Sequence, residues 1–464
     1  MKSVVTLLLF AGFSFAGMAQ KMNLKEDSIM LRKIYSESLT NGHAYDDLRV
    51  LCKDVGSRLS GSLGAEMAVK WGYQTLKGYQ FDTIYLQEVM VPHWIRGNKE
   101  RGYITEENGK IHPLNLLALG GSVGTNGIIS GEIIMFKTLE DLRNADKNLV
   151  TGKIVFVAQR MDQHFPAAFN AYGNSFEVRG SSASIAAEKG AKSVLIRSLS
   201  LSENDFPNTG VMNYKEGVDK IPAAALSTNE ASALEKLIST SKQPLTVYLE
   251  LDCRSLPDVK SYNVIGEMRG AKYPKSIITV GGHLDSWDVS ESAHDDGAGI
   301  VHSMESVRLL KVLNYKPLHT IRVVFFMNEE NGNRGGKGYA NIAQEKNEHH
   351  IFAIESDEGG FTPRGFAFDG TDKKHAFINQ FMPLFEPYFV HLLEKGYSGV
   401  DITPLKSHFS NIGLFGLIPD SQRYFDIHHN ANDVFENINK RELQMGAATV
   451  SSLIYLLDKY WGEE

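Results

Sequence analysis

The sequence predicts an α/β protein in which helices sandwich a mixed, mostly parallel β-sheet and a β-rich domain interrupts the chain. After position 261, near-continuous apolar strands alternate with helices, which is typical of a parallel sheet covered on both faces. Between 115 and 251, short β-runs alternate with loops instead. The 464 residues, 42% hydrophobic and 22% charged, are enough for two or three domains with buried cores. We therefore expect 20–114 and 252–464 to form the main domain around an insertion at 115–251.

The first 19 residues predict a secretory signal peptide. Lys2 precedes an apolar stretch from Val4, and the small residues Gly17 and Ala19 stand at the −3 and −1 positions of a cleavage site. The apolar stretch is too short for a membrane span of ~20 residues, and no later run approaches that length without charge. We expect an exported protein, periplasmic or extracellular, with no integral membrane segment.

Ahead of the insertion, helices are expected at 27–40 and 45–55, and a candidate propeptide lies between Gln20 and about Tyr45. A turn-rich stretch follows, and then apolar residues at helical spacing predict a further helix around 69–76. A strand is expected at 84–94, closed by its proline. Within the insertion we expect strands at 131–136, 152–157 and 193–196 and helices at 184–190 and 229–240.

The C-terminal half repeats a strand, loop and helix pattern. Ile300, Met304 and Val307 share one face of a helix predicted over 299–313. The expected strands lie at 261–270, 276–280, 320–330, 351–360 and 414–418.

Charge and cysteine content exclude some classes of protein. The formal net charge is −7 and the chain has no Lys/Arg-rich run, so nucleic acid is not an expected partner. Cys52 and Cys253 are the only cysteines, so there is no disulfide framework. The two thiols either pair or stay buried and free, and we favour buried, free cysteines.

Acidic and imidazole side chains gather where the predicted strands end. In parallel sheets ligands bind beyond the carboxyl ends of the strands, so these residues are expected to share one pocket. Crowded carboxylates repel one another and lose hydration unless a cation is present. Histidine with Asp and Glu, and almost no Cys, suits zinc in an incompletely filled coordination sphere. The residues concerned are His283, Asp285, Glu329, Glu330, Asp357, His428 and His429.

Five strings in this half resemble the co-catalytic two-zinc aminopeptidase family of metallopeptidases: HLDSWD, DDGAG, NEENG, ESD and the spacing of His429 to Asp433. SRLSGS, VPHWIRG and GGHLDSWDV are similar to the carboxypeptidase Q branch of that family, so the resemblance covers the whole mature chain. It implies a secreted exopeptidase that hydrolyses dipeptides or short peptides. It also implies that the insertion is a protease-associated domain and that the protein dimerises.

The resemblance further implies two zinc ions bridged by the carboxylate of Asp295. His283 and Asp357 would complete the shell of one zinc, and Glu330 and His429 that of the other. Two such ions lower the pKa of a water and polarise the scissile carbonyl.

Three neighbouring residues are candidates for catalytic roles. Glu329 is implied as the general base that moves the water's proton to the leaving amine. Asp285, two residues after His283, either orients that imidazole or is an Asx-turn residue. His428 either helps to bind the oxyanion or simply packs. We interpret His294 as a solvated loop residue rather than an extra ligand.

The remaining acidic residues of these loops have simpler interpretations. Asp288, Glu291 and Asp296 are expected to be turn or helix N-terminal carboxylates. Asp401 either borders the substrate pocket or caps a turn.

Three alternatives to the carboxypeptidase Q-like function stay open. They are an aminopeptidase of the same family, a one-zinc glutaminyl cyclotransferase on the same scaffold, and a non-catalytic receptor or binding module. The complete ligand set argues against the last two. The sequence leaves open which substrate terminus is recognised.

Overall fold

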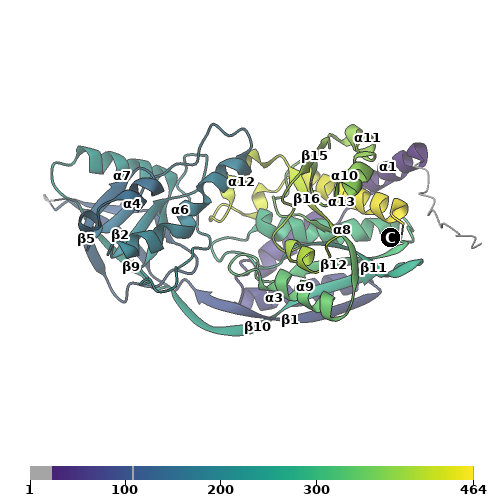
Figure 1. Cartoon of the computed structure of the whole chain (residues 1–464), viewed down its shortest axis with the longest axis horizontal. Helices are drawn as coiled ribbons and strands as arrows, with labels where there is room; N and C mark the ends of the chain where they lie inside the picture. The colour runs from purple at the N-terminus through teal and green to yellow at the C-terminus, as the bar shows by residue number, and fades with distance from the viewer. Residues whose placement is uncertain (1–22, 107–108, 463–464) are drawn as a thin grey trace, which may run out of the picture.

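The chain folds into two lobes, each built around an eight-stranded sheet (Figure 1). The structure is a computed structural model, and it describes residues 23–106 and 109–462. The predicted signal peptide lies outside the described residues. Within those residues, no helix combines the length and the apolarity needed to cross a bilayer.

The sheet of the main lobe is mixed, with a parallel centre. Its strand order is β1-β10-β12-β11-β13-β16-β14-β15. The pairs β12–β11, β11–β13, β13–β16 and β14–β15 are parallel, and the other three pairs are antiparallel. The predicted fold class is therefore confirmed. The strands are β1 (Thr83–Ile95), β10 (Arg254–Met268), β11 (Tyr273–His283), β12 (His319–Phe326), β13 (His349–Glu355), β14 (Pro363–Asp369), β15 (Leu392–Lys395) and β16 (Gly413–Pro419).

Helices cover this sheet on both faces because its central strands are apolar on both faces. In β12, Ile321 and Val323 point into one core cluster, whereas Val324 and Phe326 point into another. The first cluster lies under α1 (Leu24–Asn41), α2 (Ala44–Val50), α3 (Leu63–Gly78), α8 (Ala298–Val312) and α13 (Lys440–Tyr460), and the second lies under α9 (Arg334–Glu345).

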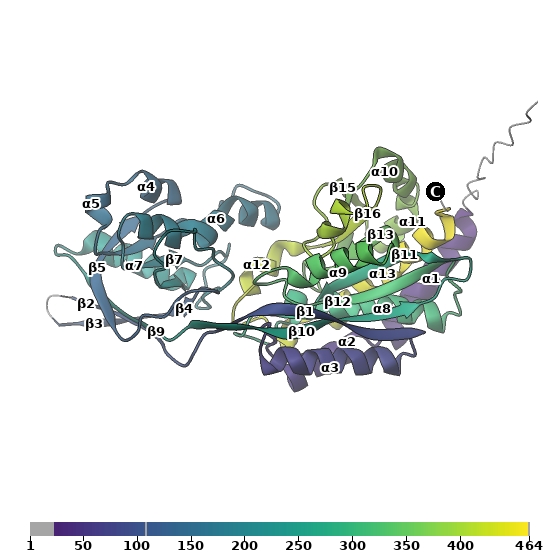
Figure 2. The ribbon, with the colours of Figure 1, turned by 60° about the horizontal axis from the view of Figure 1, so that its bottom comes forward.

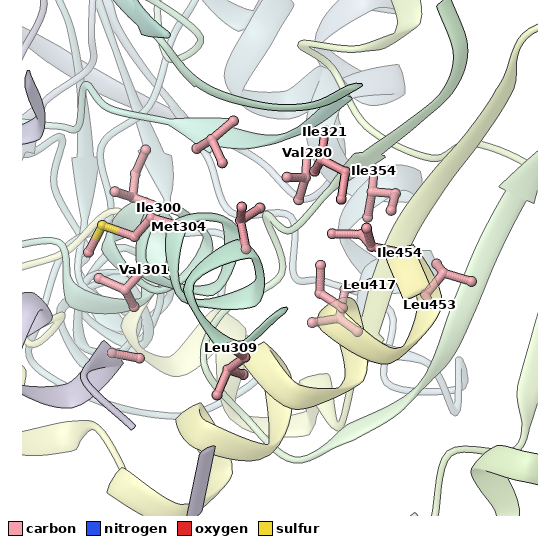
Figure 3. Close-up of a cluster of buried hydrophobic side chains, with 14 of the residues drawn as sticks. Val280, Ile300, Val301, Met304, Leu309, Ile321, Ile354, Leu417, Leu453 and Ile454 are labelled. Atoms are coloured by element: carbon pink, nitrogen blue, oxygen red, sulfur yellow. The ribbon is translucent and has the colours of Figure 1, made fainter. Parts of the chain in front are cut away.

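The core between the sheet and helices α8 and α13 is closely packed and apolar. Figure 3 shows Val280, Ile321 and Ile354, from three adjacent strands, facing Met304 of α8 and Ile454 of α13. All five side chains are buried. This packing holds the strand ends of the parallel centre in fixed positions.

The N-terminal helix α1 is part of the main lobe. It lies beside α13 (Figure 1), and its Leu31 and Ile34 are buried. The carboxylate of Asp27 accepts hydrogen bonds from the hydroxyls of Tyr455 and Tyr460 at 2.9 and 2.7 Å. The described part of the candidate propeptide therefore packs into the core of the main lobe.

The second lobe holds the insertion. Its strand order is β3-β2-β9-β5-β6-β7-β8-β4, and its sheet begins at Glu100, ahead of the boundary expected at 115. Figure 2 shows β1 and β10 running from the main lobe towards it. The elements are β2 (Glu100–Thr105), β3 (Ile111–Leu114), β4 (Leu116–Ala118), β5 (Ile129–Phe136), β6 (Ile154–Val157), β7 (Ser193–Arg197), β8 (Ala223–Leu226), β9 (Thr246–Leu251), α4 (Leu139–Asn144), α5 (Lys147–Val150), α6 (Ala168–Glu188) and α7 (Thr228–Thr240).

Several predicted boundaries are wrong. Helix α6 was expected only at 184–190, but it begins at Ala168. Gly173, Gly180 and several serines obscure its apolar periodicity, because tertiary packing rather than propensity stabilises it. Strand β1 does not close at Pro92 but continues to Ile95, with a register shift beside the proline.

The two cysteines, Cys52 and Cys253, are both buried, and they do not form a disulfide with each other.

The remaining segments are short. Helical turns complete the fold at Leu51–Val55, Ala293–Gly297, α10 (Asp372–Asn379), α11 (Met382–Phe385), Glu386–Tyr388, Thr403–Ser407, Ser421–Arg423, α12 (Tyr424–Ile427) and Phe435–Asn437.

Candidate metal centre

The structure brings the five candidate ligands together at the carboxyl end of the parallel strands. His283 is the last residue of β11, and Asp357 follows β13 by two residues. Asp295 lies in the turn that precedes α8, and its peptide bond to Asp296 is cis. Glu330 follows β12, and His429 follows α12. His283 and Asp295 flank a single loop, so the five ligands come from four segments, which meet at one edge of the sheet.

Asp295 stands at the centre of the cluster, because its two carboxylate oxygens face different histidines. Nε2 of His283 lies 3.2 Å from Oδ1 of Asp295 and 3.2 Å from Oδ1 of Asp357. Nε2 of His429 lies 3.0 Å from Oδ2 of Asp295 and 3.1 Å from Oε2 of Glu330. The ligand atoms therefore form two neighbouring sets that share one carboxylate.

The residues fit a divalent metal. Within the part of the chain that the structure describes, ligand atoms of His283, Asp295 and Glu330 lie within 4.8 Å of one another, as do those of Asp295, His428 and His429. Oε1 of Glu330 is buried and accepts no hydrogen bond from the described residues. Buried carboxylate and imidazole donors without thiolates suit zinc.

The electrostatics of the cluster lead to the same conclusion. Burial lowers the pKa of His283, but the charges of Asp357 and Asp295 outweigh it and hold that pKa well above its usual value. Burial likewise lowers the pKa of His429, and Glu330 and Asp295 raise it overall to about 9. The carboxylates thus favour positive charge at the cluster, and a divalent cation would supply it in place of the protons on the histidines.

The role of Asp285 differs from the expected one. Nδ1 of His283 donates to the main-chain carbonyl of Asp285 at 2.9 Å, whereas the nearer carboxylate oxygen is 3.9 Å away. The carboxylate instead accepts hydrogen bonds from the main-chain N–H groups of Asn328 at 2.6 Å and Glu329 at 3.0 Å. Asp285 therefore contacts the imidazole through its main-chain carbonyl and not through its carboxylate. It holds the segment that carries Glu329 and Glu330.

That segment is a turn and not a strand end. Strand β12 was expected to reach Glu330, but it ends at Phe326. Asn328 follows with a φ of 73°, in the left-handed region. Glu330 contributes to the ligand cluster, whereas Glu329 lines the neighbouring cleft. The turn, rather than strand alternation, separates the two side chains.

Two carboxylates that sequence reasoning assigned no ligand role support the bridging loop. Asp433 accepts hydrogen bonds from the main-chain N–H groups of His294 at 2.8 Å and Asp295 at 3.1 Å. Asp296 is fully buried and accepts from the N–H groups of His283 and Gly299, each at 2.9 Å. In the sequence, only the position of Asp433, four residues after His429, indicated a role for it.

A buried arginine also holds this loop. Arg58 is fully buried, and its guanidinium donates to the main-chain carbonyls of Leu284 at 2.9 Å, Glu291 at 2.7 Å and Ser292 at 3.1 Å. It lies in the SRLSGS string, but nothing in the spacing of that string indicated its partners.

His294 is buried, so the prediction of a solvated loop residue is wrong. Its Nδ1 accepts a hydrogen bond from the N–H of Gly360 at 3.1 Å, and its ring stacks on Phe361 with centroids 4.3 Å apart. Burial lowers its pKa to about 4. The side chain is therefore a neutral packing element.

The other acidic residues lie outside the ligand cluster. Asp288 pairs with Arg96 at 2.7 Å, and Glu291 pairs with Lys53 at 2.7 Å. Asp401 is fully buried, and burial followed by the charge of Glu355 raises its pKa well above the usual value.

His428 lies against His429 with ring centroids 3.5 Å apart. Its Nε2 is 3.6 Å from Oδ2 of Asp295, and its side chain lines the cleft. Burial, then the charge of His429, lowers its pKa well below the usual value. A neutral imidazole thus faces the cleft beside the ligands.

The cleft has a volume of about 1060 Å³ and is lined by both lobes. Helix α6 of the insertion contributes Tyr172, Phe176 and Arg179, and the main lobe contributes Glu329 and the ligand cluster. Arg179 is 3% exposed, and it donates to the hydroxyl of Tyr172 at 2.5 Å and to the carbonyl of Val211 at 3.3 Å. Arg179 lies in the part of α6 that the sequence did not predict, and no motif in the sequence indicated a role for it.

Comparisons with known proteins agree with this geometry. The model of "Peptidase family M28" matches residues 263–454. Carboxypeptidase Q of Bos taurus is 32% identical over 434 residues, which cover 93% of this chain and 88% of the relative. A peptidase M28 precursor from Shewanella amazonensis has a solved structure that superposes with a TM-score of 0.89 at 32% identity, covering 95% of this chain and 98% of that one. A zinc aminopeptidase from Bacillus subtilis shares the fold, with a TM-score of 0.63 at 20% identity over 89% of this chain and 94% of that one.

Proposed function

The chain belongs to peptidase family M28 and is a zinc metallopeptidase of the exopeptidase type, and from that premise we propose that it hydrolyses dipeptides or short peptides at a two-zinc centre, as a carboxypeptidase Q-like enzyme. One observation carries the proposal. The two oxygens of Asp295 face His283 on one side and His429 on the other, at 3.2 and 3.0 Å. A carboxylate in that position is suited to bridge two metal ions.

The five ligands divide between the two metals around this bridge. His283 and Asp357 would hold one zinc, Glu330 and His429 the other, and Asp295 both. When bound, the zinc ions supply Lewis acidity that polarises the scissile carbonyl and lowers the pKa of a water. The protein fixes ligands in advance through buried hydrogen bonds to their main chain, such as those that Asp433 accepts from Asp295 and Asp285 accepts from Glu330.

Glu329 moves the proton in this reaction. Its carboxylate accepts a proton from the attacking water and delivers it to the leaving amine nitrogen. Burial, with the charges of Asp357 and Glu330, raises the pKa of Glu329 well above its usual value. A raised pKa suits a group that must accept and then release a proton near neutral pH. The neutral imidazole of His428 is placed to donate to the oxyanion of the tetrahedral intermediate.

Arg179 favours recognition of the substrate's carboxyl terminus. It is buried in the cleft wall and pairs with no carboxylate among the residues that the structure describes. A buried guanidinium without an anionic partner is costly, and the carboxylate of a short peptide would pair with it bidentately. This supports a carboxypeptidase or dipeptidase.

Aminopeptidase activity is the second candidate, because Glu358 and Glu394 also line the cleft and would bind a free ammonium. Burial, then the charge of Asp357, raises the pKa of Glu358 to about 8, so a cation beside it would be stabilising. A one-zinc glutaminyl cyclotransferase is the third candidate, and the second ligand set argues against it.

The Glu329→Gln variant tests the reaction. We expect it to keep two equivalents of zinc, measured by elemental analysis, while kcat falls by about 10²–10⁴-fold, since the general base is lost. Glu66→Gln, at an exposed helical position, is the control. Turnover at the wild-type rate would refute the role of Glu329, and loss of a zinc equivalent would show that it is a ligand.

A substrate panel decides between the exopeptidase classes. Unblocked, N-blocked and C-blocked dipeptides are assayed with chelator and with added zinc. We expect C-blocking to raise KM in the wild type and to have little further effect in Arg179→Gln. An enzyme that tolerates a blocked carboxyl terminus but not a blocked amino terminus would be an aminopeptidase. Export and dimerisation stay predictions, as does the role of 115–251 as a protease-associated domain.

A further inference from the structure

The insertion contacts the adjacent residues His428 and His429 through a single loop, residues 208–210. Nδ2 of Asn208 donates to the main-chain carbonyl of His428 at 2.5 Å. The main-chain N–H of Thr209 donates to the carbonyl of His429 at 2.9 Å. Asn208 and Thr209 are 3% and 0% exposed, so these bonds are shielded from water. The contact joins segments about 220 positions apart.

The same loop reaches the imidazole of His429 itself. Nδ1 of His429 lies 3.3 Å from the main-chain carbonyl of Thr209. Because a carbonyl can only accept, this contact favours a proton on Nδ1, which leaves Nε2 free to bind metal. The guanidinium of Arg179, which can only donate, is farther from the same atom, with Nη1 3.5 Å from Nδ1. Nε2 is the atom that faces Asp295 and Glu330. Groups that bind the far nitrogen of a ligand imidazole set its tautomer and its direction.

The backbone at His429 requires such support. Its φ is 60°, in the left-handed region that residues other than glycine adopt at an energetic cost. Such conformations persist where surrounding contacts over-determine them. The three bonds from Asn208 and Thr209 are contacts of this kind, and they come entirely from the other lobe.

The loop is in turn fixed to the insertion. The N–H of Asn208 donates to Oγ of Ser198 at 2.8 Å, and Oγ1 of Thr209 donates to the carbonyl of Ala118 at 2.9 Å. The N–H of Gly120 donates to the carbonyl of Gly210 at 2.9 Å. Short, buried hydrogen bonds therefore couple the position of His429 to the position of the insertion.

A second set of contacts links the 208–210 loop to the loop between His283 and Asp295. Arg96 pairs with Asp288, in the loop between His283 and Asp295, and its Nη2 also donates to Oγ1 of Thr209 at 3.3 Å. Thr209 therefore reaches the loop between His283 and Asp295 through Arg96, which lies ahead of the insertion, whereas it contacts His429 directly.

We propose that Asn208 and Thr209 are positioning residues that complete the metal site of His429, so that this site depends on the docked insertion and the His283 site does not. The inference rests on the proposed function in one respect, namely that His429 is a metal ligand. Asn208 is the residue to change, because the contacts of Thr209 with His429 are made by its main chain.

The experiment measures metal affinity and not activity. Zinc binding to the purified full-length protein is titrated against a competing chelator for the wild type and for Asn208→Ala. We expect one of the two equivalents to bind about 10-fold more weakly in the variant, the lower end of the effect of removing a group that supports a ligand, because Asn208 holds the main chain next to His429 and not its imidazole. The other equivalent keeps the wild-type affinity.

The matched control is Asn115→Ala. Nδ2 of Asn115 also donates to a main-chain carbonyl within the insertion, that of Asp205 at 2.6 Å, but it lies away from the metal centre. We expect both equivalents to bind this variant with wild-type affinity. Equal weakening in Asn115→Ala and Asn208→Ala would overturn the proposal, because the effect would then be one of general destabilisation.

A double-mutant cycle separates this inference from the proposed function. His429→Ala should remove one equivalent, and adding Asn208→Ala to it should not weaken the remaining one. If His429→Ala still binds two equivalents, the proposed ligand set is wrong. If His429→Ala loses one equivalent but Asn208→Ala binds both normally, the ligand set stands and the positioning role is wrong.

A second variant guards against failure to fold. Asn208→Leu keeps a side chain of similar volume but has no donor for the carbonyl of His428. It should show the same weakening of one equivalent, with a circular dichroism spectrum like that of the wild type. Wild-type affinity for both equivalents in a folded Asn208→Leu protein would overturn the proposal.

Discussion

Replacing Asp285 by Asn tests the support of the turn that carries the proposed base and a proposed ligand. The carboxylate accepts two short hydrogen bonds from the N–H groups of Asn328 and Glu329, at 2.6 and 3.0 Å, in a fully buried position. Both N–H groups bind the same oxygen, Oδ1, so Asn keeps an uncharged acceptor there, and its NH2 replaces Oδ2, which accepts from the N–H of Glu330 at 3.4 Å. A bond to a charged acceptor contributes about 1.5–3 kcal/mol and a neutral one about 0.5–1.5 kcal/mol, so weakening both bonds should cost about 2–3 kcal/mol of unfolding free energy.

The catalytic effect should follow from the same displacement. A shift of Glu329 by about 1 Å costs on the order of 10²-fold in rate. Urea unfolding and kcat are measured for Asp285→Asn and for a control in the same loop, Glu291→Gln. The carboxylate of Glu291 is less buried and accepts a hydrogen bond from one main-chain N–H, that of Phe435 at 2.9 Å. We expect the Glu291 variant to lose about 1 kcal/mol and little activity. If Asp285→Asn unfolds at the wild-type urea concentration with normal kcat, the carboxylate does not support this turn.

Three further predictions concern stability. Removing metal with a chelator should lower Tm, since the crowded carboxylates are no longer neutralised, and zinc at 100 times its Kd should restore about 2.7 kcal/mol for each of the two sites. A Tm that does not change with the free zinc concentration would contradict this. Burial lowers the pKa of His302 to about 4, so the unfolded chain, with a pKa near 6.5, takes up a proton that the folded chain refuses. Stability should therefore fall by up to about 3 kcal/mol between pH 6.5 and 4, and His302→Gln should flatten that slope in urea unfolding at several pH values. In Gly120→Ala, the added Cβ would meet the indole of Trp287 at 1.8 Å, so we expect a loss of about 1–3 kcal/mol and altered tryptophan fluorescence, and an unchanged protein would show that the lobes repack freely.

The parallel centre of the main sheet could be predicted from sequence because its strands are buried on both faces and therefore read as unbroken apolar runs. Helix α8 could be predicted from the spacing of Ile300, Met304 and Val307. Helix α6 could not, because Gly173, Gly180 and its serines hide the face that packs. The end of β12 was misplaced for a related reason, since Asn328 turns the chain and no apolar pattern marks a turn of that kind.

The same contrast applies to the site. The resemblance carried by an ordered set of strings made the candidate ligands recognisable: His283, Asp295, Glu330, Asp357 and His429. Four of them lie at a strand end or just ahead of a helix, and the ends of parallel strands converge whatever the loops do. That part was determined by local sequence and by sheet topology together.

Only the tertiary structure decided which groups support those residues. The carboxylate of Asp285 binds a turn about 44 residues away, and Asn208 meets His428 across about 220. Such partners share no periodicity and no motif, because they depend on which segments, distant in sequence, come together when the chain folds. Residue types at strand ends therefore indicated the chemistry from sequence alone, whereas the positioning of that chemistry depends on long-range packing between the lobes.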